Sequence, residues 1–291
     1  MDGSKLILGT VQFGMNYGIA NREGQPDLAK VRAILRRAAE HGIRILDTAA
    51  AYGTSETVLG TLLAEDPALK KHFQVVSKIP PLPPDASPEE IRAHIVRSAE
   101  TSLRNLKLDR LYGLLFHREE DAVHLPVLKE LQRQGKVVLC GFSVDGALPD
   151  DISGAEMIQV PGNVLDRRFI PFPRTKPRKL FVRSVYLQGL LMMPEEAVPA
   201  ALAGVIPYRR KLAALAERCG MAPAELYMRY LLSIPEIDGV LTGVDNPDQL
   251  DFNARLAERG PLEPGQLREI MELVPDLPEA WIRPKLWPKK Q

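Results

Sequence analysis

Residues 111–142, LYGLLFHREEDAVHLPVLKELQRQGKVVLCGF, contain the pattern on which the fold prediction rests. The stretch opens with the apolar run LYGLLF and closes with the apolar run KVVLCGF, and each run is long enough for one strand. Between them, an amphipathic segment from Val127 to Gln134 ends at Gly135, which is typical of the end of a helix. Strands that are apolar on both faces are typical of parallel sheets, where a helix connects neighbouring strands. Residues 111–142 therefore predict a strand–helix–strand unit with two parallel strands.

The same pattern recurs along the whole chain. Apolar runs that predict strands occupy residues 6–9, 43–46, 73–77, 111–116, 136–142, 155–160, 179–185 and 238–241. Helices are expected at 28–41, 56–63, 88–106, 127–134, 209–218, 223–232 and 247–258, with Ser87 as the N-cap of the third. Eight buried strands with helical crossovers predict a single α/β domain over residues 1–291, a (β/α)8 TIM barrel. The crossover at 161–179 is expected to be mostly loop, because it carries four prolines.

The rival architecture is a doubly wound open sheet that binds a dinucleotide. In that fold a G-x-G-x-x-G motif follows the first strand. Here LGTVQFG (8–14) has glycines only at positions 9 and 14. The barrel is therefore the preferred prediction.

The composition is that of a globular protein with little net charge. Of 291 residues, 38 are Lys or Arg and 37 are Asp or Glu, which gives a formal charge of +1 and argues against nucleic acid or an anionic membrane as partner. The most apolar window, 185–193, is much shorter than the ~20 residues of a membrane span. No signal-peptide pattern opens the chain, and two cysteines cannot supply a disulfide framework or a cysteine metal site. We therefore expect a cytoplasmic protein without a metal.

Ionisable side chains follow three successive predicted strands. Asp47, Lys78 and His117 each come directly after an apolar run, and Tyr52 lies in the loop after Asp47. In a (β/α)8 barrel these strand ends meet at the face that carries the active site. A phenol has a pKa of ~10, and a nearby ammonium favours its phenolate form. With the lysine held by a buried carboxylate, such a site can pass a proton to a carbonyl oxygen, and the electron pair would come from a hydride carrier.

The motifs around these residues resemble those of the aldo-keto reductase superfamily. LGTVQFGMNYG (8–18), DTAAAYGTSE (47–56), SKIP (77–80), LLFHRE (114–119) and QGLL (188–191) follow the order of the family over nearly the whole chain. The resemblance implies a (β/α)8 barrel that reduces aldehydes and ketones, or oxidises the alcohols, with a nicotinamide cofactor. It also implies Tyr52 as the general acid/base, Lys78 as the group that makes Tyr52 more acidic, and Asp47 as the ion-pair partner of Lys78. His117 would orient the carbonyl.

The same resemblance places cofactor contacts after strands five to eight. Ser143 and Gln159 would hold the nicotinamide carboxamide, and Arg183 takes the place of the usual stacking aromatic. The candidates for the pyrophosphate loop are Ser184, Leu187 and Gly189, and those for the adenosine end are Gly243, Gln249 and Asn253.

Two positions depart from the family pattern. Val144 and Asp145 stand where an asparagine is expected, and the usual cation for a 2′-phosphate is missing beside the acidic Asp245. A carboxylate repels a phosphate group. NADP(H) is preferred on the habit of the family, and NAD(H) is the alternative.

Substrate contacts are assigned to three residues. Phe13 and Tyr17 in the first loop are candidates, as is Arg118, which would favour polar or acidic carbonyl compounds such as sugars or would point into solvent. The basic stretch at 167–179 is either a solvated loop or a set of contacts for cofactor phosphates or an anionic substrate.

Two other functions remain open. One is a lysine aldolase or isomerase on the same barrel, with Lys78 as a Schiff base, although an ion pair with Asp47 would keep the amine protonated. The other is a cofactor-sensing binding subunit without turnover. The sequence leaves the substrate, the direction of reaction and the oligomeric state open.

Overall fold

Eight parallel strands close into a barrel in the order of the sequence, in a computed structural model that describes residues 4–19, 21, 24–172 and 177–288. The strands are β1 (Leu6–Gly9), β2 (Ile45–Asp47), β3 (Gln74–Ile79), β4 (Leu111–Phe116), β5 (Val137–Ser143), β6 (Met157–Pro161), β7 (Lys179–Arg183) and β8 (Gly239–Gly243). The last strand pairs in parallel with the first, so the sheet has no edge. The prediction of a (β/α)8 barrel is confirmed.

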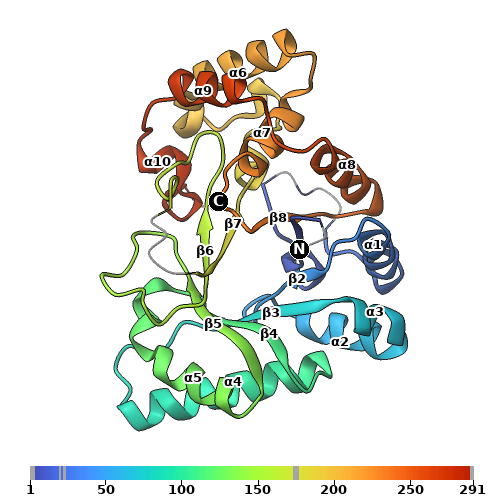
Figure 1. The fold of residues 1–291 in the computed structure, drawn as a ribbon, viewed down its shortest axis with the longest axis vertical. Coiled ribbons are helices and arrows are strands. Elements are labelled where there is room, and N and C mark those ends of the chain that lie inside the picture. Colours follow the sequence, from blue (N-terminus) through green and yellow to red (C-terminus); the bar gives the residue numbers. More distant parts are fainter. Residues whose placement is uncertain (1–3, 20, 22–23, 173–176, 289–291) are drawn as a thin grey trace.

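Helices surround the strands on the outside, as Figure 1 shows. They are α1 (Leu28–Glu40), α2 (Ser55–Glu65), α3 (Pro67–His72), α4 (Pro88–Leu106), α5 (Leu125–Arg133), α6 (Ile206–Arg218), α7 (Pro223–Leu232), α8 (Pro247–Glu258), α9 (Pro264–Leu273) and α10 (Glu279–Ile282). The seven predicted helices are present, and Ser87 caps α4 in a capping box with Glu90. The short helix α3 and the helices α9 and α10 were not predicted. Between β6 and β7, the described residues 162–172 and 177–178 contain no helix, in agreement with the predicted loop.

The interior of the barrel is filled by one apolar layer. Its six buried side chains, which form a cluster separate from the larger core between strands and helices, are Ile7, Val76, Leu115, Met157, Phe181 and Leu241. Because side chains alternate between the two faces of a strand, the residue two positions further along again points into the barrel. The next inward position toward the C-terminal end of each strand therefore lies on top of this layer.

Strand β7 ends two residues earlier than predicted. The apolar run continues to Val185, but Ser184 adopts the left-handed backbone conformation with φ of 71°, which cannot continue a strand. The chain turns there into the loop over the barrel mouth.

Candidate active site

Polar residues occupy the inward positions directly above the apolar layer. Lys78 lies two residues after Val76, His117 two after Leu115, and Asp47 two after Ile45, which packs against the layer. The corresponding positions on the remaining strands after β4 are Ser143, Gln159, Arg183 and Gly243. The alternation of the strands thus brings predicted site residues from seven strands to one rim.

Lys78 and Asp47 form a buried ion pair at this rim. The Lys78 Nζ lies 2.5 Å from Asp47 Oδ1 and also donates to the Thr48 carbonyl at 3.0 Å. The second carboxylate oxygen of Asp47 accepts a hydrogen bond from Gln159 Nε2 at 2.8 Å. Burial alone would lower the pKa of Lys78, but the neighbouring Asp47 and Tyr52 raise it above its ordinary value. The amine is therefore held as an ammonium.

Tyr52 and His117 lie against this ion pair. The Lys78 Nζ is 5.1 Å from the centre of the Tyr52 ring, and the Tyr52 and His117 rings meet edge to face with centres 5.8 Å apart. Burial, followed by the positive charges of Lys78 and Arg183, lowers the pKa of His117 to about 4. Near neutral pH, His117 is thus uncharged and can donate a hydrogen bond from one ring nitrogen without adding a positive charge to the site.

Two glycines fix the place of Tyr52. A Cβ on Gly14 would stand 1.8 Å from the Tyr52 carbonyl oxygen, and one on Gly53 would stand 2.3 Å from the Gly14 carbonyl oxygen. Gly53 also has φ of 55°, a left-handed conformation that favours glycine. The loop after β1 therefore packs directly on the loop that carries Tyr52, and any side chain at either glycine would push them apart.

The remaining polar residues of the DTAAAYGTSE motif build the support beneath Tyr52. The Ser55 hydroxyl, at the start of α2, donates to the Thr10 carbonyl at 2.8 Å and accepts from the Thr48 hydroxyl at 3.0 Å. Glu56 accepts a 2.6 Å hydrogen bond from the Ser77 hydroxyl, next to Lys78. These buried bonds join the ends of β1, β2 and β3 to α2. These roles of Ser55 and Glu56 were not predicted from the sequence.

A cavity of about 920 Å³, the cleft, opens above the rim. Its lining includes the four predicted acid–base residues together with eight of the nine predicted cofactor residues, namely Ser143, Gln159, Arg183, Ser184, Gly189, Gly243, Gln249 and Asn253. Leu187 is the exception, because its side chain is fully buried in the core. Its backbone N–H donates to the Ser184 carbonyl at 2.9 Å, so the expectation that Leu187 contacts the cofactor pyrophosphate gains no support from its position.

The loop after β7 has an unusual backbone. Ser184, Leu187, Gln188 and Gly189 all have positive φ, from 48° to 96°. Three of these residues are consecutive, so the loop lacks the alternation of right- and left-handed residues that forms an anion-binding nest. The N–H groups of Leu187 and Gly189 donate to the Ser184 and Tyr186 carbonyls at 2.9 Å. The Asn163 side chain holds the loop by donating to the Ser184 carbonyl at 3.1 Å.

The expected substrate residues have different positions. Phe13 is fully buried in the core and does not line the cleft, so the expectation for it is wrong; the 3-10 turn at Val11–Phe13 points its ring inward. Tyr17 lines the cleft, and its hydroxyl accepts a 3.2 Å hydrogen bond from Gln188 across the opening. Arg118 also lines the cleft, but its guanidinium binds both carboxylate oxygens of Asp121 and the Leu82 carbonyl.

Arg183 is part of a network of charged side chains that was not predicted from the sequence. Its guanidinium donates to the Val144 carbonyl at 2.8 Å and lies 3.5 Å from the Asp145 carboxylate. Arg283, beyond the barrel, binds the other oxygen of Asp145 at 3.2 Å. Burial alone would raise the pKa of Asp145, but Arg183, Arg283 and Lys285 hold it below its ordinary value. Asp145 therefore links the C-terminal segment to the rim.

The described members of the basic stretch at 167–179 have structural partners. Arg167 donates to the Met271 and Val274 carbonyls, Arg168 pairs with Asp166, Arg178 donates to the Ile152 carbonyl and Lys179 pairs with Asp238. None of these four lines the cleft. Arg174 and Lys176 lie outside the described residues.

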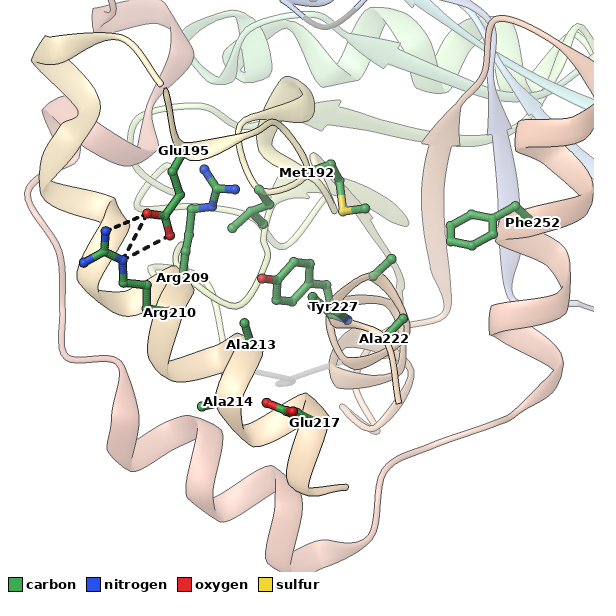
Figure 2. A pocket seen from close by; sticks show the side chains of 13 residues that line it. Met192, Glu195, Arg209, Arg210, Ala213, Ala214, Glu217, Ala222, Tyr227 and Phe252 are labelled. Carbon is green, nitrogen blue, oxygen red and sulfur yellow. Dashed lines mark hydrogen bonds and ion pairs between the residues drawn. The ribbon is translucent and has the colours of Figure 1, made fainter. Parts of the chain in front are cut away.

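A second cavity of about 550 Å³ lies between α6, α7 and the segment at 191–195. Figure 2 shows its side chains, with the Glu195–Arg210 ion pair at one edge and the Tyr227 ring in the wall. Met192 and Phe252 line both this cavity and the cleft. Its lining in the described chain contains no lysine or histidine next to a tyrosine, so the cleft is the candidate active site.

Comparisons with known proteins identify the family of the chain. The sequence model of the Aldo/keto reductase family matches residues 5–275. The chain belongs to the aldo/keto reductase family.

Individual aldo/keto reductases and related proteins are similar at low identity. An uncharacterized oxidoreductase of Mycobacterium tuberculosis is 26% identical over 288 residues, covering 88% of this chain and 84% of that protein. A 6-dehydroglucose reductase of Novosphingobium aromaticivorans is 30% identical over 155 residues, covering 48% of this chain and 49% of that protein. The solved holo form of an aldo-keto reductase from Bacillus halodurans matches with a TM-score of 0.76 and 21% identity, over 94% of this chain and 93% of that one. This last likeness concerns the fold alone.

Membership of the aldo/keto reductase family makes the chain an oxidoreductase that acts on small carbonyl compounds, in a family that generally uses nicotinamide cofactors. The residues present fit such a cofactor. Two buried polar atoms of cleft-lining residues, Gln12 Oε1 and His117 Nδ1, have no hydrogen-bond partner among the described residues. In the described chain no helix has the length and hydropathy that crossing a membrane requires.

Proposed function

We propose that the chain is an NAD(P)H-dependent reductase that converts an aldehyde or ketone to the alcohol, with Tyr52 as the proton donor. The observation that carries the proposal is the contact of one phenol with both a buried, ion-paired ammonium and a neutral imidazole. An ammonium beside a phenol favours the phenolate and so makes loss of the proton easier. This is the arrangement needed to protonate a carbonyl oxygen near pH ~7.

Each of the four side chains has a distinct task in this proposal. Tyr52 donates its hydroxyl proton to the oxygen of the substrate, and the Lys78 ammonium stabilises the phenolate that remains. Asp47 fixes the Lys78 Nζ at 2.5 Å and keeps it charged. His117 donates a hydrogen bond to the same carbonyl oxygen and orients it toward Tyr52.

A nicotinamide dinucleotide bound in the cleft supplies the hydride. Ser143 and Gln159 would hold its carboxamide, the loop at 184–189 its diphosphate, and Gly243, Gln249 and Asn253 its adenosine. Gln159 has an amide oxygen left for this task, because its Nε2 is bound to Asp47. The preference for NADP(H) over NAD(H) follows the cofactor that members of the family usually bind.

For the substrate we propose a neutral, polar carbonyl compound such as a sugar. Four cations (Lys78, Arg118, Arg183 and Lys285) and four anions (Asp47, Glu119, Asp145 and Asp245) line the described cleft. Their charges balance, and a balanced wall rich in hydrogen-bonding groups suits hydroxyl groups rather than a net charge. The relative from Novosphingobium is, by its name, a reductase of a dehydrogenated sugar.

The geometry argues against the Schiff-base alternative. A lysine nucleophile must lose its proton, whereas the contacts of Lys78 with Asp47 and the Thr48 carbonyl favour the charged form. Borohydride should therefore trap no substrate on Lys78.

The test is a panel of aldehydes, ketones and sugars, followed at the NAD(P)H absorbance with both cofactors. Tyr52→Phe should reduce kcat by about 10²–10⁴, while the dissociation constant of NAD(P)H stays close to that of the wild type. Tyr208→Phe is the matched control, because Tyr208 also lies near a lysine but on the outer helix α6, remote from the cleft lining. Tight cofactor binding without turnover of any carbonyl would instead support the binding-subunit alternative.

A further inference from the structure

The rim of the cleft holds two cations whose charges are compensated to different degrees. Lys78 is fully buried and lies 2.5 Å from Asp47. The Arg183 side chain is 28% exposed and lies 3.5 Å from Asp145, which it shares with Arg283. Arg283 also pairs with Glu279. The Arg183 pair is nevertheless longer and more exposed than the Lys78 pair, so the positive charge of Arg183 is less fully cancelled.

Arg183 faces the centre of the proposed reaction. It is the inward residue two positions after Phe181, at the C-terminal end of β7, and it lines the same cavity as Tyr52 and His117. Its guanidinium has five N–H groups, of which one is bound to the Val144 carbonyl. Its charge is close enough to His117 to contribute to the low pKa of that imidazole.

A nicotinamide that delivers hydride must lie at the same centre. The carbonyl carbon that receives the hydride is bonded to the oxygen that Tyr52 protonates, so the ring must approach within contact distance of that carbon. The floor beside Tyr52, Lys78 and His117 is completed by the ends of β5, β6 and β7, which carry Ser143, Gln159 and Arg183. A ring on this floor is close to the Arg183 charge.

Reduced and oxidised nicotinamide differ by one unit of charge on the ring. The reduced ring is neutral, and the oxidised ring is positive. A partly compensated cation beside the ring destabilises the oxidised form and has little effect on the reduced form. We propose that Arg183 makes the cleft bind reduced nicotinamide dinucleotide more tightly than the oxidised form. The enzyme then carries mainly the reduced cofactor, which is the form needed for carbonyl reduction.

This inference rests on the proposed function and adds the direction in which the reaction runs, from carbonyl to alcohol. The overall equilibrium between carbonyl and alcohol does not change, because an enzyme alters only the bound states. What changes is the fraction of enzyme that carries reduced cofactor at a given ratio of the two forms. Asp145 opposes the effect, because its carboxylate neutralises part of the Arg183 charge.

The experiment measures binding, without turnover. Dissociation constants of the reduced and the oxidised dinucleotide are determined by fluorescence and calorimetry for the wild type, Arg183→Gln, Arg183→Lys and Asp145→Asn. The ratio of oxidised to reduced dissociation constants should be about tenfold or more in the wild type and should fall about tenfold in Arg183→Gln. It should be retained in Arg183→Lys and should rise in Asp145→Asn, because Arg183 then loses the carboxylate that lies 3.5 Å from its guanidinium.

The control is Arg36→Gln, which removes an exposed cation of α1 far from the cleft lining and should leave the ratio unchanged. Thermal unfolding of each variant shows whether it is folded, and Arg183→Lys keeps the test valid if Arg183→Gln is not. An unchanged ratio in Arg183→Gln overturns the inference. If the KM for carboxylate-bearing carbonyl compounds rises instead, Arg183 recognises substrate. A wild type that binds neither dinucleotide contradicts the proposed function itself.

Discussion

Lys78 Nζ lies 2.5 Å from Asp47 Oδ1, and the two side chains are 1% and 3% exposed. At this depth each charge depends on the other. Separating a buried pair by removing one partner costs about 3–5 kcal/mol, because the remaining charge has no compensation. The pair therefore matters for folding, and in the proposed mechanism it matters for catalysis as well.

Removing one member of this pair should destabilise the protein more than removing both. We expect Asp47→Asn to lower the free energy of unfolding by about 3 kcal/mol, and the double variant Asp47→Asn with Lys78→Met to recover much of that loss. Urea unfolding of the wild type, the two single variants and the double variant measures this coupling. Additive single effects would show that the charges are not coupled. All three variants should lose turnover, because each removes or uncouples the ammonium beside Tyr52.

The close packing of two glycine loops predicts that a single methyl group displaces Tyr52. In Gly14→Ala the new Cβ would overlap the Tyr52 carbonyl oxygen at 1.8 Å, so kcat should fall at least tenfold and stability by about 1–3 kcal/mol. Gly265→Ala on α9 is the control, because a Cβ there meets nothing within 4 Å. It should leave kcat unchanged. Wild-type kcat in Gly14→Ala would show that the two loops can move apart without moving Tyr52.

The lowered pKa of His117 should appear in the pH dependence of stability. With a pKa of about 4 in the folded protein and ~6.5 in the unfolded chain, the unfolded chain alone binds the proton between these values. Stability should therefore decrease as the pH falls from ~6.5 to ~4, by about 3 kcal/mol in total, and this contribution should be constant outside that range. In His117→Gln this contribution should be absent, as the difference between the two unfolding curves against pH will show. An NMR titration of His117 near its ordinary value would contradict the expectation.

The acidic residue at one end of the cleft should reduce the affinity for a phosphorylated dinucleotide. Asp245 lines the cleft beside Gln249, and its carboxylate accepts a hydrogen bond from Asn21 at 3.1 Å. Asp245→Asn should raise the affinity for NADPH about tenfold and leave that for NADH nearly unchanged, because only NADPH carries the extra phosphate. Asp248→Asn, an exposed residue of α8 outside the cleft lining, is the control. If the wild type bound NADH at least tenfold more tightly than NADPH, the expected preference for NADP(H) would be overturned.

The barrel was predictable from short apolar runs that alternate with amphipathic helical segments, and the rim from the polar residues that directly follow those runs. An apolar residue such as Val76 or Leu115 fills the interior, and the next inward residue, Lys78 or His117, is the first that meets the cleft. This two-residue spacing involves only neighbouring positions in the sequence, so it can be recognised before the packing of the helices is known. Several strand ends differ from the prediction by one or two residues. Strands β2 and β3 extend further than predicted because Asp47 and Lys78 remain part of the sheet although they are polar.

Contacts between distant segments could not be predicted in the same way. Nothing near Arg183 in the sequence indicates that Asp145 and Arg283 share its charge network, since the three residues come from a strand end, a loop and the segment after α10. Phe13 was misplaced for a related reason. Whether a side chain in a loop points into the core or the cleft depends on a single backbone turn, here the 3-10 turn at Val11–Phe13.

The C-terminal segment is attached to the cleft, and this matters when the substrates of related proteins are compared. The match to the family ends at residue 275, whereas Arg283 binds Asp145 and both Pro284 and Lys285 line the cleft. Alignments restricted to the shared barrel omit this part of the wall. Two relatives with the same acid–base residues can thus differ at the entrance, and the stretch downstream of the common region is where such differences in selectivity should be sought first.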